Sequence, residues 1–426
     1  MKRYIVFVAS LHAINILTSF RAWREKVKFV ISPNLSDELA LKGIDVYKSD
    51  ELTVEMLGDV PIVLLDDDKT FFDSQLLDLF AHCKTRFVTR NQWVIEMLED
   101  PSVLISPASA RLDICTRCQL NCVSCYMRRD KRETTGIGHV TPSQFETFLE
   151  RNPYLRNIEI SNSGEPFLHP QMHEILEIAH NHDVTLTCFT GSNFNYVTEQ
   201  VLEDLVNFRF KTINIALDGA SQETYSAYRR NGNFDQVIAN IKKLNEIKKR
   251  EHSNYPKLYW QFIVMSHNYD DVPLAEKMAK ELGMIISFRD TWDSNEKSKL
   301  EKMLSCRKGE HGEEQEANRQ IVTGKKNTFN SWCRDLLIFP QINWDGRLLG
   351  CCQVYCSDWG VNVFDVGLTE ALNSDVYRKT LLALLKAEPL PYPQTPCATC
   401  GVRPKTAEEA ENILTRYTHH YEKKSP

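Results

Sequence analysis

Three closely spaced cysteines place the strongest constraint on this chain. Cys118, Cys122 and Cys125 form a CxxxCxxC pattern, and an aromatic residue, Tyr126, follows directly. A cubane [4Fe–4S] cluster with a closed ligand set takes four cysteine thiolates, so three would leave one iron open to an outside ligand. An open iron suits an iron–sulfur protein that performs chemistry better than one that only relays electrons. The pattern therefore favours a reactive cluster.

A structural zinc site is the alternative at the same cysteines. Zinc also binds short-spaced cysteines, but a closed zinc site needs four nitrogen or sulfur ligands. Cys115 is one candidate for the fourth ligand, and His139 is a more distant one. The triplet alone leaves both interpretations open, and the sequence around it has to decide between them.

Length and composition bound the class of protein. The chain has 426 residues, which predicts two or three domains, and its composition is ordinary for a globular protein. A net charge of −6 with mixed signs gives no broad basic surface, so nucleic acid is not expected as a partner. No apolar run approaches the roughly 20 residues of a membrane helix, and the first residues lack the form of a signal peptide. We expect a cytoplasmic protein without a membrane partner.

The distribution of the 13 cysteines supports metal or redox chemistry. Most of them fall in two groups, residues 115–125 and 333–400. In a reducing compartment, clustered cysteines indicate metal sites rather than disulfides. Cys83, Cys188 and Cys306 stand apart, and for these we expect a buried, apolar packing role.

Residues 1–105 are predicted to form a small α/β domain. Short apolar runs at 4–9, 28–31 and 61–65 are typical of buried strands, and apolar residues between them have helical spacing. No glycine-rich nucleotide motif is present. The acidic run Asp66-Asp67-Asp68 is predicted to be a solvated loop rather than a cation site.

Residues 106–293 alternate between strand and helix patterns, which predicts an α/β fold with a parallel sheet, open or curled into a barrel. Ligands of such sheets bind at the carboxyl ends of the strands. Four predicted strands are 157–160, 184–189, 212–217 and 258–264.

The remaining residues divide into three predicted segments. Residues 294–332 are rich in Lys, Glu and Gln and are interpreted as a polar linker. Residues 333–404 form a cysteine-rich domain, in which Asp345-Gly346 predicts a hairpin between strands at 337–339 and 348–349. Residues 405–426 are predicted to be a terminal helix that begins with a capping box at Thr406.

Four further stretches follow the first cysteine group, each at or beside a predicted strand. They are Asn162-Ser163-Gly164-Glu165-Pro166, Thr190-Gly191-Ser192-Asn193, the segment from Leu217-Asp218-Gly219 to Phe234, and the strand that contains Ile263. Together with CxxxCxxC, their order and spacing resemble the radical S-adenosylmethionine (SAM) superfamily over residues 110–290. The resemblance implies a partial (β/α)6 barrel. It also implies SAM bound to the open iron of a [4Fe–4S] cluster.

The resemblance assigns roles to individual residues. It implies that the metal ligands of the SAM-binding cluster are Cys118, Cys122 and Cys125. It implies that SAM is contacted by Tyr126, Ser163, Gly164, Glu165, Pro166, Thr190, Ser192, Asn193, Arg229, Arg230 and Ile263. Two positions depart from the family pattern. Ser163 replaces a glycine of the GGEP motif, and Ala216 replaces a serine, which puts one hydroxyl contact to SAM in doubt.

The second cysteine group resembles the auxiliary-cluster extension called SPASM in its long form and twitch in its short form. The short form, with one auxiliary [4Fe–4S] cluster, fits because no cysteine follows the last CxxC pair. The implied ligands are Cys333, Cys351, Cys397 and Cys400. A zinc ribbon is the alternative. Cys352 and Cys356 are left over; Cys356 is a candidate catalytic hydrogen donor, although packing beside the cluster explains both.

The function implied by the resemblance is that of a radical SAM oxidoreductase. Such an enzyme cleaves SAM to a 5′-deoxyadenosyl radical and abstracts a hydrogen atom from its substrate. A small polar substrate, such as a sugar or aminocyclitol, is expected, with one electron passing to the auxiliary cluster and flavodoxin or ferredoxin as electron donor. The alternatives are a peptide maturase, a dehydratase or deaminase, and a non-catalytic zinc or iron–sulfur scaffold.

Overall fold

The structure is a computed structural model of the chain. The residues that it describes are 4–32, 44–66, 74–82, 86–125, 135–289, 319–322, 333–352, 357–401 and 403–411. They group into two compact units. The first unit draws on residues 1–109, 329–340 and 366–416, and the second on 110–328, 341–365 and 417–426. The division into five segments made from the sequence stays a prediction.

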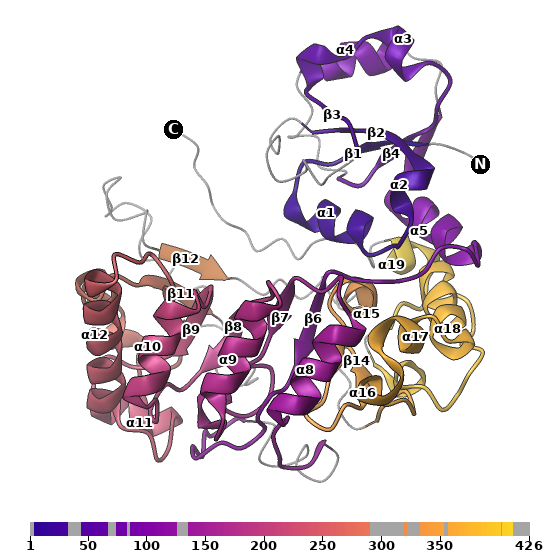
Figure 1. Cartoon of the computed structure of the whole chain (residues 1–426). Helices are drawn as coiled ribbons and strands as arrows, with labels where there is room; N and C mark the ends of the chain where they lie inside the picture. The colour runs from indigo at the N-terminus through magenta and orange to yellow at the C-terminus, as the bar shows by residue number, and fades with distance from the viewer. Residues whose placement is uncertain are drawn as a thin grey trace. The chain divides into compact units, whose positions relative to one another are not determined.

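The first unit contains a parallel sheet of five strands in the order β3-β2-β1-β4-β5. The strands are β1 Tyr4–Phe7, β2 Val27–Ile31, β3 Val46–Tyr47, β4 Ile62–Leu64 and β5 Phe87–Thr89. Helices α3 (Val54–Leu57) and α4 (Ser74–His82) lie on one face, and α1 (Leu11–Thr18) lies on the other (Figure 1). Apolar side chains of β1, β2 and β4 pack against Leu57 and Leu76 of the two helices. The strands predicted from the apolar runs at 4–9, 28–31 and 61–65 are therefore present as β1, β2 and β4.

The acidic run after β4 differs from its prediction. Asp66 is only 6% exposed, and its carboxylate accepts bonds from the backbone N–H groups of Ala9, at 2.5 Å, and Ser10, at 2.9 Å. It also accepts the Ser10 hydroxyl at 2.6 Å. The prediction of a solvated loop was wrong for Asp66, because the open N–H groups after β1 and at the start of α1 bind this carboxylate. Asp67 and Asp68 lie outside the described residues.

C-terminal helices complete the first unit. They include α15 (Asp335–Ile338), α17 (Leu368–Leu372), α18 (Asp375–Lys386) and α19 (Ala407–Glu411). Arg378 of α18 donates to carbonyl groups at the end of α5 (Arg90–Glu99) and in the loop after it, including Val103 O at 2.7 Å. Asn91 of α5 donates to Ala410 O of α19 at 2.6 Å. Residues far apart in sequence thus share one core.

The second unit is built on a sheet of nine strands in the order β12-β11-β10-β9-β8-β7-β6-β13-β14. From β12 to β13, every pairing for which a register is defined is parallel, and β13 and β14 form an antiparallel hairpin at the edge. The strands are β6 Ser109–Leu112, β7 Asn157–Glu159, β8 Thr185–Ser192, β9 Thr212–Ala216, β10 Lys257–Ile263, β11 Ile285–Arg289, β12 Arg319–Val322, β13 Gln341–Ile342 and β14 Leu348–Gly350. This is the parallel sheet predicted from the alternating pattern.

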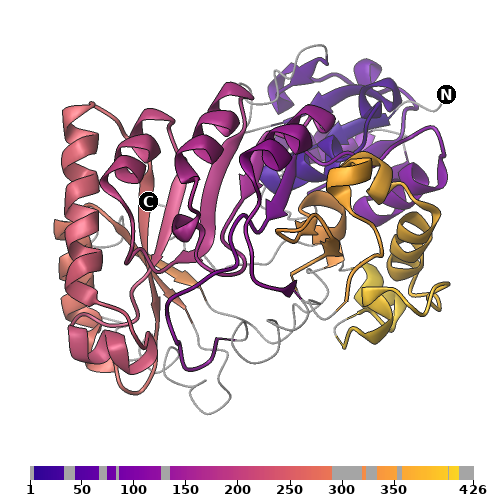
Figure 2. The same ribbon diagram turned by 60° about the horizontal axis from the view of Figure 1, so that its bottom comes forward.

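Helices cover one face of this sheet, which curves around its other face (Figure 2). They are α8 Pro142–Arg151, α9 Met172–Asn181, α10 Glu199–Asn207, α11 Gln222–Tyr228, α12 Phe234–Arg250 and α13 Val272–Glu281. Most of them bury an apolar stripe, as in α10, where Val201, Leu202 and Leu205 are buried. None of the described helices is long and apolar enough to cross a membrane.

The two faces of the nine-stranded sheet differ in chemistry. Neighbouring positions that share the helix-covered face are apolar, as in Ile215, Trp260 and Ile286. The positions between them share the inner face and are polar: Glu159, Thr187, Asn214, Gln261 and Ser287. A parallel sheet buried only for packing carries apolar residues on both faces, so the inner face is suited to binding a polar group.

The predicted hairpin forms with a different first strand. Its turn contains Gly346 at φ +87°, a conformation that glycine adopts without steric cost. The strands are β13 and β14, whereas Leu337 and Ile338 belong to helix α15 and Phe339 follows it. The strand predicted at 337–339 was wrong because three consecutive apolar residues fit a short buried helix as well as a strand.

Candidate active site

The three cysteines of the first group lie in the loop after β6. Cys122 is buried, and Cys118 and Cys125 are partly buried. Burial, with the nearby Glu165 carboxyl as a second cause, raises the pKa of Cys118 to about 12, and burial likewise raises the pKa of Cys122. Thiols in this setting need a cation to become thiolates, and bound metal supplies it.

Two side-chain N–H donors point at the sulfurs of this loop. Asn193 Nδ2 lies 3.6 Å from Cys118 Sγ, and Arg229 Nη1 lies 3.7 Å from Cys122 Sγ. Such donors stabilise cluster sulfur and tune its potential. In the described part of the chain, no three His, Cys, Asp or Glu side chains converge as ligands of one ion. Cysteines of an iron–sulfur cluster bind different irons, so they need not converge on one point.

Backbone bonds fix the cysteine loop from two sides. Asn121 N donates to Arg230 O at 2.8 Å, and Val123 N donates to Tyr228 O at 3.2 Å, both at the end of α11. On the other side, Glu165 N donates to Arg117 O at 2.7 Å. The loop is therefore positioned by two of the segments that the sequence assigned to SAM binding.

Gly164 packs directly on the backbone of Cys115 and Thr116, which leads from β6 into the cysteine loop. It has φ +78°, and a Cβ there would lie 2.4 Å from the carbonyl oxygen of Cys115. Its neighbour Ser163 is 2% exposed and donates from its backbone N–H to Asp113 at 2.8 Å. Pro166 begins a short 3-10 helix, Pro166–Leu168. Only glycine fits at position 164, because any side chain would enter the backbone of the loop.

Glu165 is buried and braces the end of β8. Its carboxylate accepts the Ser192 hydroxyl and the Asn193 N–H, each at 2.6 Å. Burial raises the pKa of Glu165 to about 7, against the lowering effect of these bonds. Asn193, which is oriented in this way, bonds Cys118 and Gln119. Glu165 thus acts on the cysteine loop through Asn193, and its contact with SAM stays a prediction.

Arg229 and Asp218 form a buried ion pair. Arg229 Nε donates to Asp218 Oδ2 at 2.6 Å, and the Asp218 side chain is fully buried. The other carboxylate oxygen accepts the backbone N–H of Ile263 at 2.7 Å. The pair therefore connects the segment from Leu217 to Phe234 with the strand that contains Ile263, and Arg229 also reaches Cys122 of the cysteine loop. The adjacent Arg230 is exposed. Thr190 is also exposed and donates its N–H to Glu159 at 3.2 Å.

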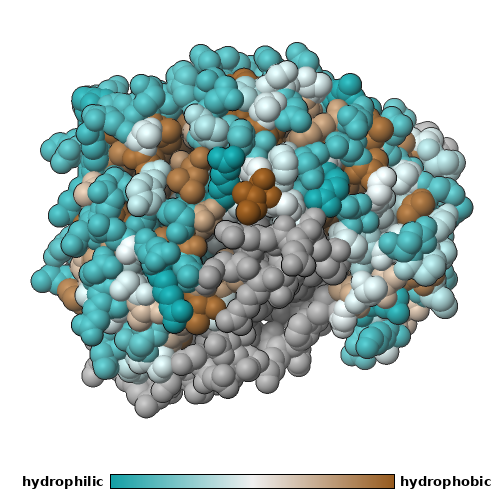
Figure 3. All heavy atoms as spheres, turned by 90° about the horizontal axis from the view of Figure 1, so that it is seen from below, coloured by the Kyte–Doolittle hydropathy of each residue, from teal (hydrophilic) through white to brown (hydrophobic). Residues whose placement is uncertain are grey.

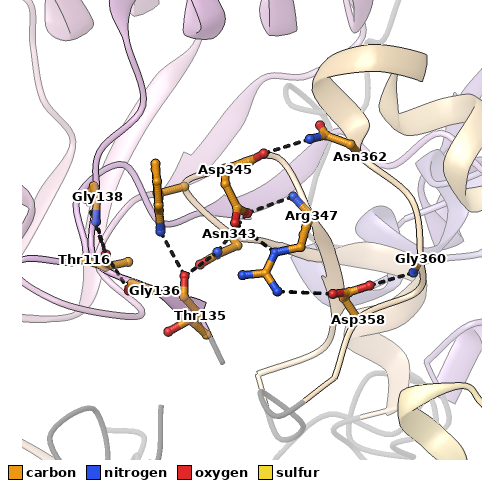
Figure 4. Close-up of polar contacts among 11 residues, drawn as sticks. Thr116, Thr135, Gly136, Gly138, Asn343, Asp345, Arg347, Asp358, Gly360 and Asn362 are labelled. Atoms are coloured by element: carbon orange, nitrogen blue, oxygen red, sulfur yellow. Dashed lines mark hydrogen bonds and ion pairs between the residues drawn. The ribbon is translucent and has the colours of Figure 1, made fainter. Parts of the chain in front are cut away.

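The edge hairpin is bonded to the segment that follows the cysteine loop (Figure 4). Asn343 Nδ2 and Trp344 Nε1 both donate to Thr135 O, at 2.8 and 2.9 Å. A Cβ at Gly138 would lie 2.4 Å from the Trp344 ring, and Gly138 N donates to the Thr116 hydroxyl at 3.0 Å. The hairpin therefore supports both ends of the cysteine loop.

The second cysteine group is divided between the two units. Cys333, Cys397 and Cys400 belong to the first unit, and Cys351 follows β14 in the second. Burial raises the pKa of Cys397 to about 12, with Cys400 as a further cause. The four-cysteine auxiliary site stays a prediction. Cys356 and Tyr126 lie outside the described residues, so the role assigned to each stays a prediction.

Sequence reasoning missed two buried carboxylates that organise the site. Glu159, at the end of β7, accepts bonds from Ser161, Thr187, Phe189 and Thr190. Asp113, after β6, joins Ser163 to Gln341 of β13. A single acid that interrupts an apolar strand was the available signal, because an acid is buried only with several donors around it.

Large hydrophobic side chains are exposed at a few described positions. On the face drawn in Figure 3 hydrophobic residues lie in small groups among hydrophilic residues. Phe189 and Tyr196, in and just after β8, are among the most exposed large hydrophobic side chains, at 57% and 63%. Both lie near the carboxyl edge of the nine-stranded sheet, where ligands of such folds bind.

The fold and the site define a parallel α/β enzyme with a buried cysteine loop at the carboxyl edge of its sheet. The model of the radical SAM superfamily matches residues 112–276. This match contains the cysteine loop and every described residue assigned to SAM binding. Residues 112–276 of this chain therefore form a radical SAM domain.

Two curated relatives align with parts of this domain. A probable GTP 3′,8-cyclase of Methanocaldococcus jannaschii is 24% identical over 180 residues, which are 42% of this chain and 57% of that protein. The mycofactocin maturase MftC of Mycobacterium tuberculosis is 25% identical over 142 residues, 33% of this chain and 35% of the relative. The chain thus spans between a third and three fifths of these relatives.

Solved structures share the fold over a longer stretch. Streptococcus suis SuiB bound to its precursor peptide SuiA superimposes with a TM-score of 0.53 and 14% identity, covering 71% of this chain and 70% of that one. SuiB bound to S-adenosylmethionine gives the same TM-score. At this identity the likeness concerns the fold.

Proposed function

We propose that this chain binds a [4Fe–4S] cluster and SAM at the cysteine loop and uses them to abstract a hydrogen atom from a peptide substrate. The main support for the SAM chemistry is that two side-chain N–H donors point at the cysteine sulfurs: Asn193 at Cys118 and Arg229 at Cys122. When bound, the cluster and SAM supply an electron and a 5′-deoxyadenosyl radical. The protein supplies orientation and excludes water.

The residues take the following proposed roles. Cys118, Cys122 and Cys125 hold the cluster, and the loop Ser163–Pro166 lies against SAM. Arg229 already donates to Asp218 and Cys122, so we assign the SAM carboxylate to the exposed Arg230. Ser192 and Asn193 position the loop, with Thr190 and Ile263 beside the nucleoside.

The peptide substrate is supported by two relatives. MftC is named a maturase, and SuiB is bound to a precursor peptide in its structure. A small polar substrate is the second candidate, because the inner face of the sheet carries hydrogen-bonding side chains and one relative is named for GTP. In either case a cluster on Cys333, Cys351, Cys397 and Cys400 would accept an electron, and flavodoxin or ferredoxin would donate one to the first cluster.

Anaerobic reconstitution tests the chemistry. We expect iron and sulfide in the purified protein and release of 5′-deoxyadenosine from SAM under dithionite. Cys122→Ala should reduce this release to background, because one of three cluster ligands is lost. Cys188→Ala is the matched control, since Cys188 is equally buried on β8 and is not a proposed ligand.

Two results would contradict the proposal. Zinc without sulfide would support the non-catalytic scaffold, and full activity of Cys122→Ala would show that Cys122 is not a cluster ligand.

The substrate is tested separately by mass spectrometry. A mass change in a short peptide encoded beside this gene would support a maturase, whereas turnover of sugars or nucleotides alone would favour the second candidate.

A further inference from the structure

We propose that Asn214 and Gln261 form a recognition site for an amide group on the inner face of the nine-stranded sheet. This inference rests on the proposed function and names the chemical group that its substrate presents. Asn214 lies on β9 and Gln261 on the neighbouring strand β10, and the register places them on the same face. They are 2% and 6% exposed.

The bonds of these two side chains fix which atom is nitrogen and which is oxygen. Asn214 Nδ2 donates to the carbonyl oxygen of Phe189 at 3.0 Å. A backbone carbonyl only accepts hydrogen bonds, so the atom of the Asn214 side-chain amide that faces Phe189 O must be the nitrogen. The same Nδ2 donates to Gln261 Oε1 at 3.2 Å. The orientation of Gln261 therefore follows from that of Asn214.

The bonded atoms leave one acceptor and one donor for a ligand. Asn214 Oδ1 is buried and has no hydrogen-bond partner among the described residues. Leaving a buried polar atom unbonded costs free energy, so such an atom in a native site indicates a missing ligand or water. Gln261 Nε2 is the donor that the Asn214 bond leaves unused.

Small residues lie around Gln261, whereas Asn214 is paired in register with the larger Tyr259. Gly191, at φ +136°, lies beside Gln261, and even a Cβ there would stay 3.7 Å from the amide atoms. Ser287 is the register partner of Gln261 on β11, and Ala216 is its partner on β9. Small residues thus flank the pair on both neighbouring strands, at the edge where parallel sheets bind ligands.

An acceptor and a donor on adjacent strands complement a group that presents an N–H and a C=O together. That group is an amide. It occurs in peptide bonds and also in the cyclic amide edge of a purine such as guanine. An ester or ether of the same shape lacks the N–H and would leave Asn214 Oδ1 unbonded.

Binding of matched probe pairs tests this site. Ligand-observed NMR with the reconstituted, SAM-bound full chain would compare N-methylpropanamide with methyl propanoate, an ester of the same shape that has no N–H. A second pair is guanosine and 6-O-methylguanosine. We expect one amide to bind about fivefold more tightly than its partner, as one hydrogen bond provides. Tighter binding of the amide in the first pair would indicate a peptide ligand. Tighter binding of guanosine in the second pair would indicate a nucleobase ligand. Equal binding within both pairs overturns the inference.

Variants test whether Asn214 and Gln261 cause the tighter binding of the amide. Gln261→Leu and Asn214→Leu should remove it while 5′-deoxyadenosine release without substrate and SAM affinity stay intact. Trp260→Phe, on the opposite face of β10, should preserve it and controls for the stability of the strand. Loss of SAM affinity in both polar variants would assign the pair to SAM and overturn the inference. Absence of SAM cleavage in the wild type would instead overturn the proposed function.

Discussion

The two sheets of this protein differ in the polar groups at the carboxyl ends of their parallel strands. In the five-stranded sheet, the order of strands reverses at β1, between β2 and β4, where ligands of such folds bind. There, Asp66 accepts the N–H groups of Ala9 and Ser10. In the nine-stranded sheet, the same edge carries cysteines, a buried ion pair and an unbonded amide oxygen.

The difference shows that fold alone does not make a binding site. A carboxylate of the chain itself satisfies the open N–H groups of the smaller sheet and stands where an anionic ligand would otherwise bind. At the corresponding edge of the larger sheet, the amide oxygen of Asn214 has no hydrogen-bond partner among the described residues. The following predictions test this contrast, from the largest effect to the smallest.

Replacing Gly164 by alanine should have the largest effect on activity. The new Cβ would lie 2.4 Å from Cys115 O and displace the cysteine loop. We expect 5′-deoxyadenosine release to fall about 100-fold, the cost of a displacement near 1 Å at a reacting centre. Gly283→Ala is the control, because Gly283 also has positive φ but nothing within 4 Å of its Cβ position. Similar losses in both variants would implicate backbone strain instead.

Breaking the ion pair of the larger sheet should cost the most stability. Asp218→Asn or Arg229→Met leaves one buried charge without its partner, which destabilises proteins by about 3–5 kcal/mol. Urea unfolding measures this loss. The double variant should lose less than the sum of the two single variants. Additive losses would show that the two side chains do not stabilise each other.

Asp66→Ala should affect the smaller sheet alone. It removes the acceptor of two N–H groups and one hydroxyl, with an expected cost of about 2 kcal/mol in unfolding free energy. Release of 5′-deoxyadenosine should stay at the wild-type rate. A loss of activity without a loss of stability would mean that the smaller sheet takes part in the reaction.

The smallest expected effect is the contribution of His169 to the pH dependence of the unfolding free energy. Burial lowers its pKa, so the unfolded chain binds a proton more readily than the folded one. Its contribution to stability is present above the unfolded pKa, near 6.5, and is lost as pH falls through the folded value. His169→Gln should flatten the decline in unfolding free energy below pH 6.5. His173→Gln should act oppositely, because Asp204 raises the pKa of His173.

The main elements of the larger sheet could be predicted from the sequence because strand and helix patterns are local. These patterns placed β7 to β10 and the helices α9, α10, α12 and α13, and the motif residues lie at the ends of these strands or in the segments that follow them. Motifs at strand ends converge because parallel strands end at one edge. This much of the site follows from pattern and spacing.

Contacts between distant residues were beyond the sequence. Asp113 joins Ser163 and Gln341, which are 50 and 228 residues away, and no spacing rule connects them. The burial of Asp66 was missed because a run of acids resembles a solvated loop. The orientation of Asn214 and Gln261 depends on the carbonyl oxygen of Phe189, whose position only the folded backbone defines.

The bond from Trp344 to Thr135 has a consequence for biosynthesis. The two residues are 209 positions apart, so the brace of the cysteine loop is made only after most of the chain has left the ribosome. Until then the loop has the bonds from α11 and Glu165 but lacks those of the hairpin. This contact beside the cysteine loop is therefore absent from any nascent chain that ends before residue 344.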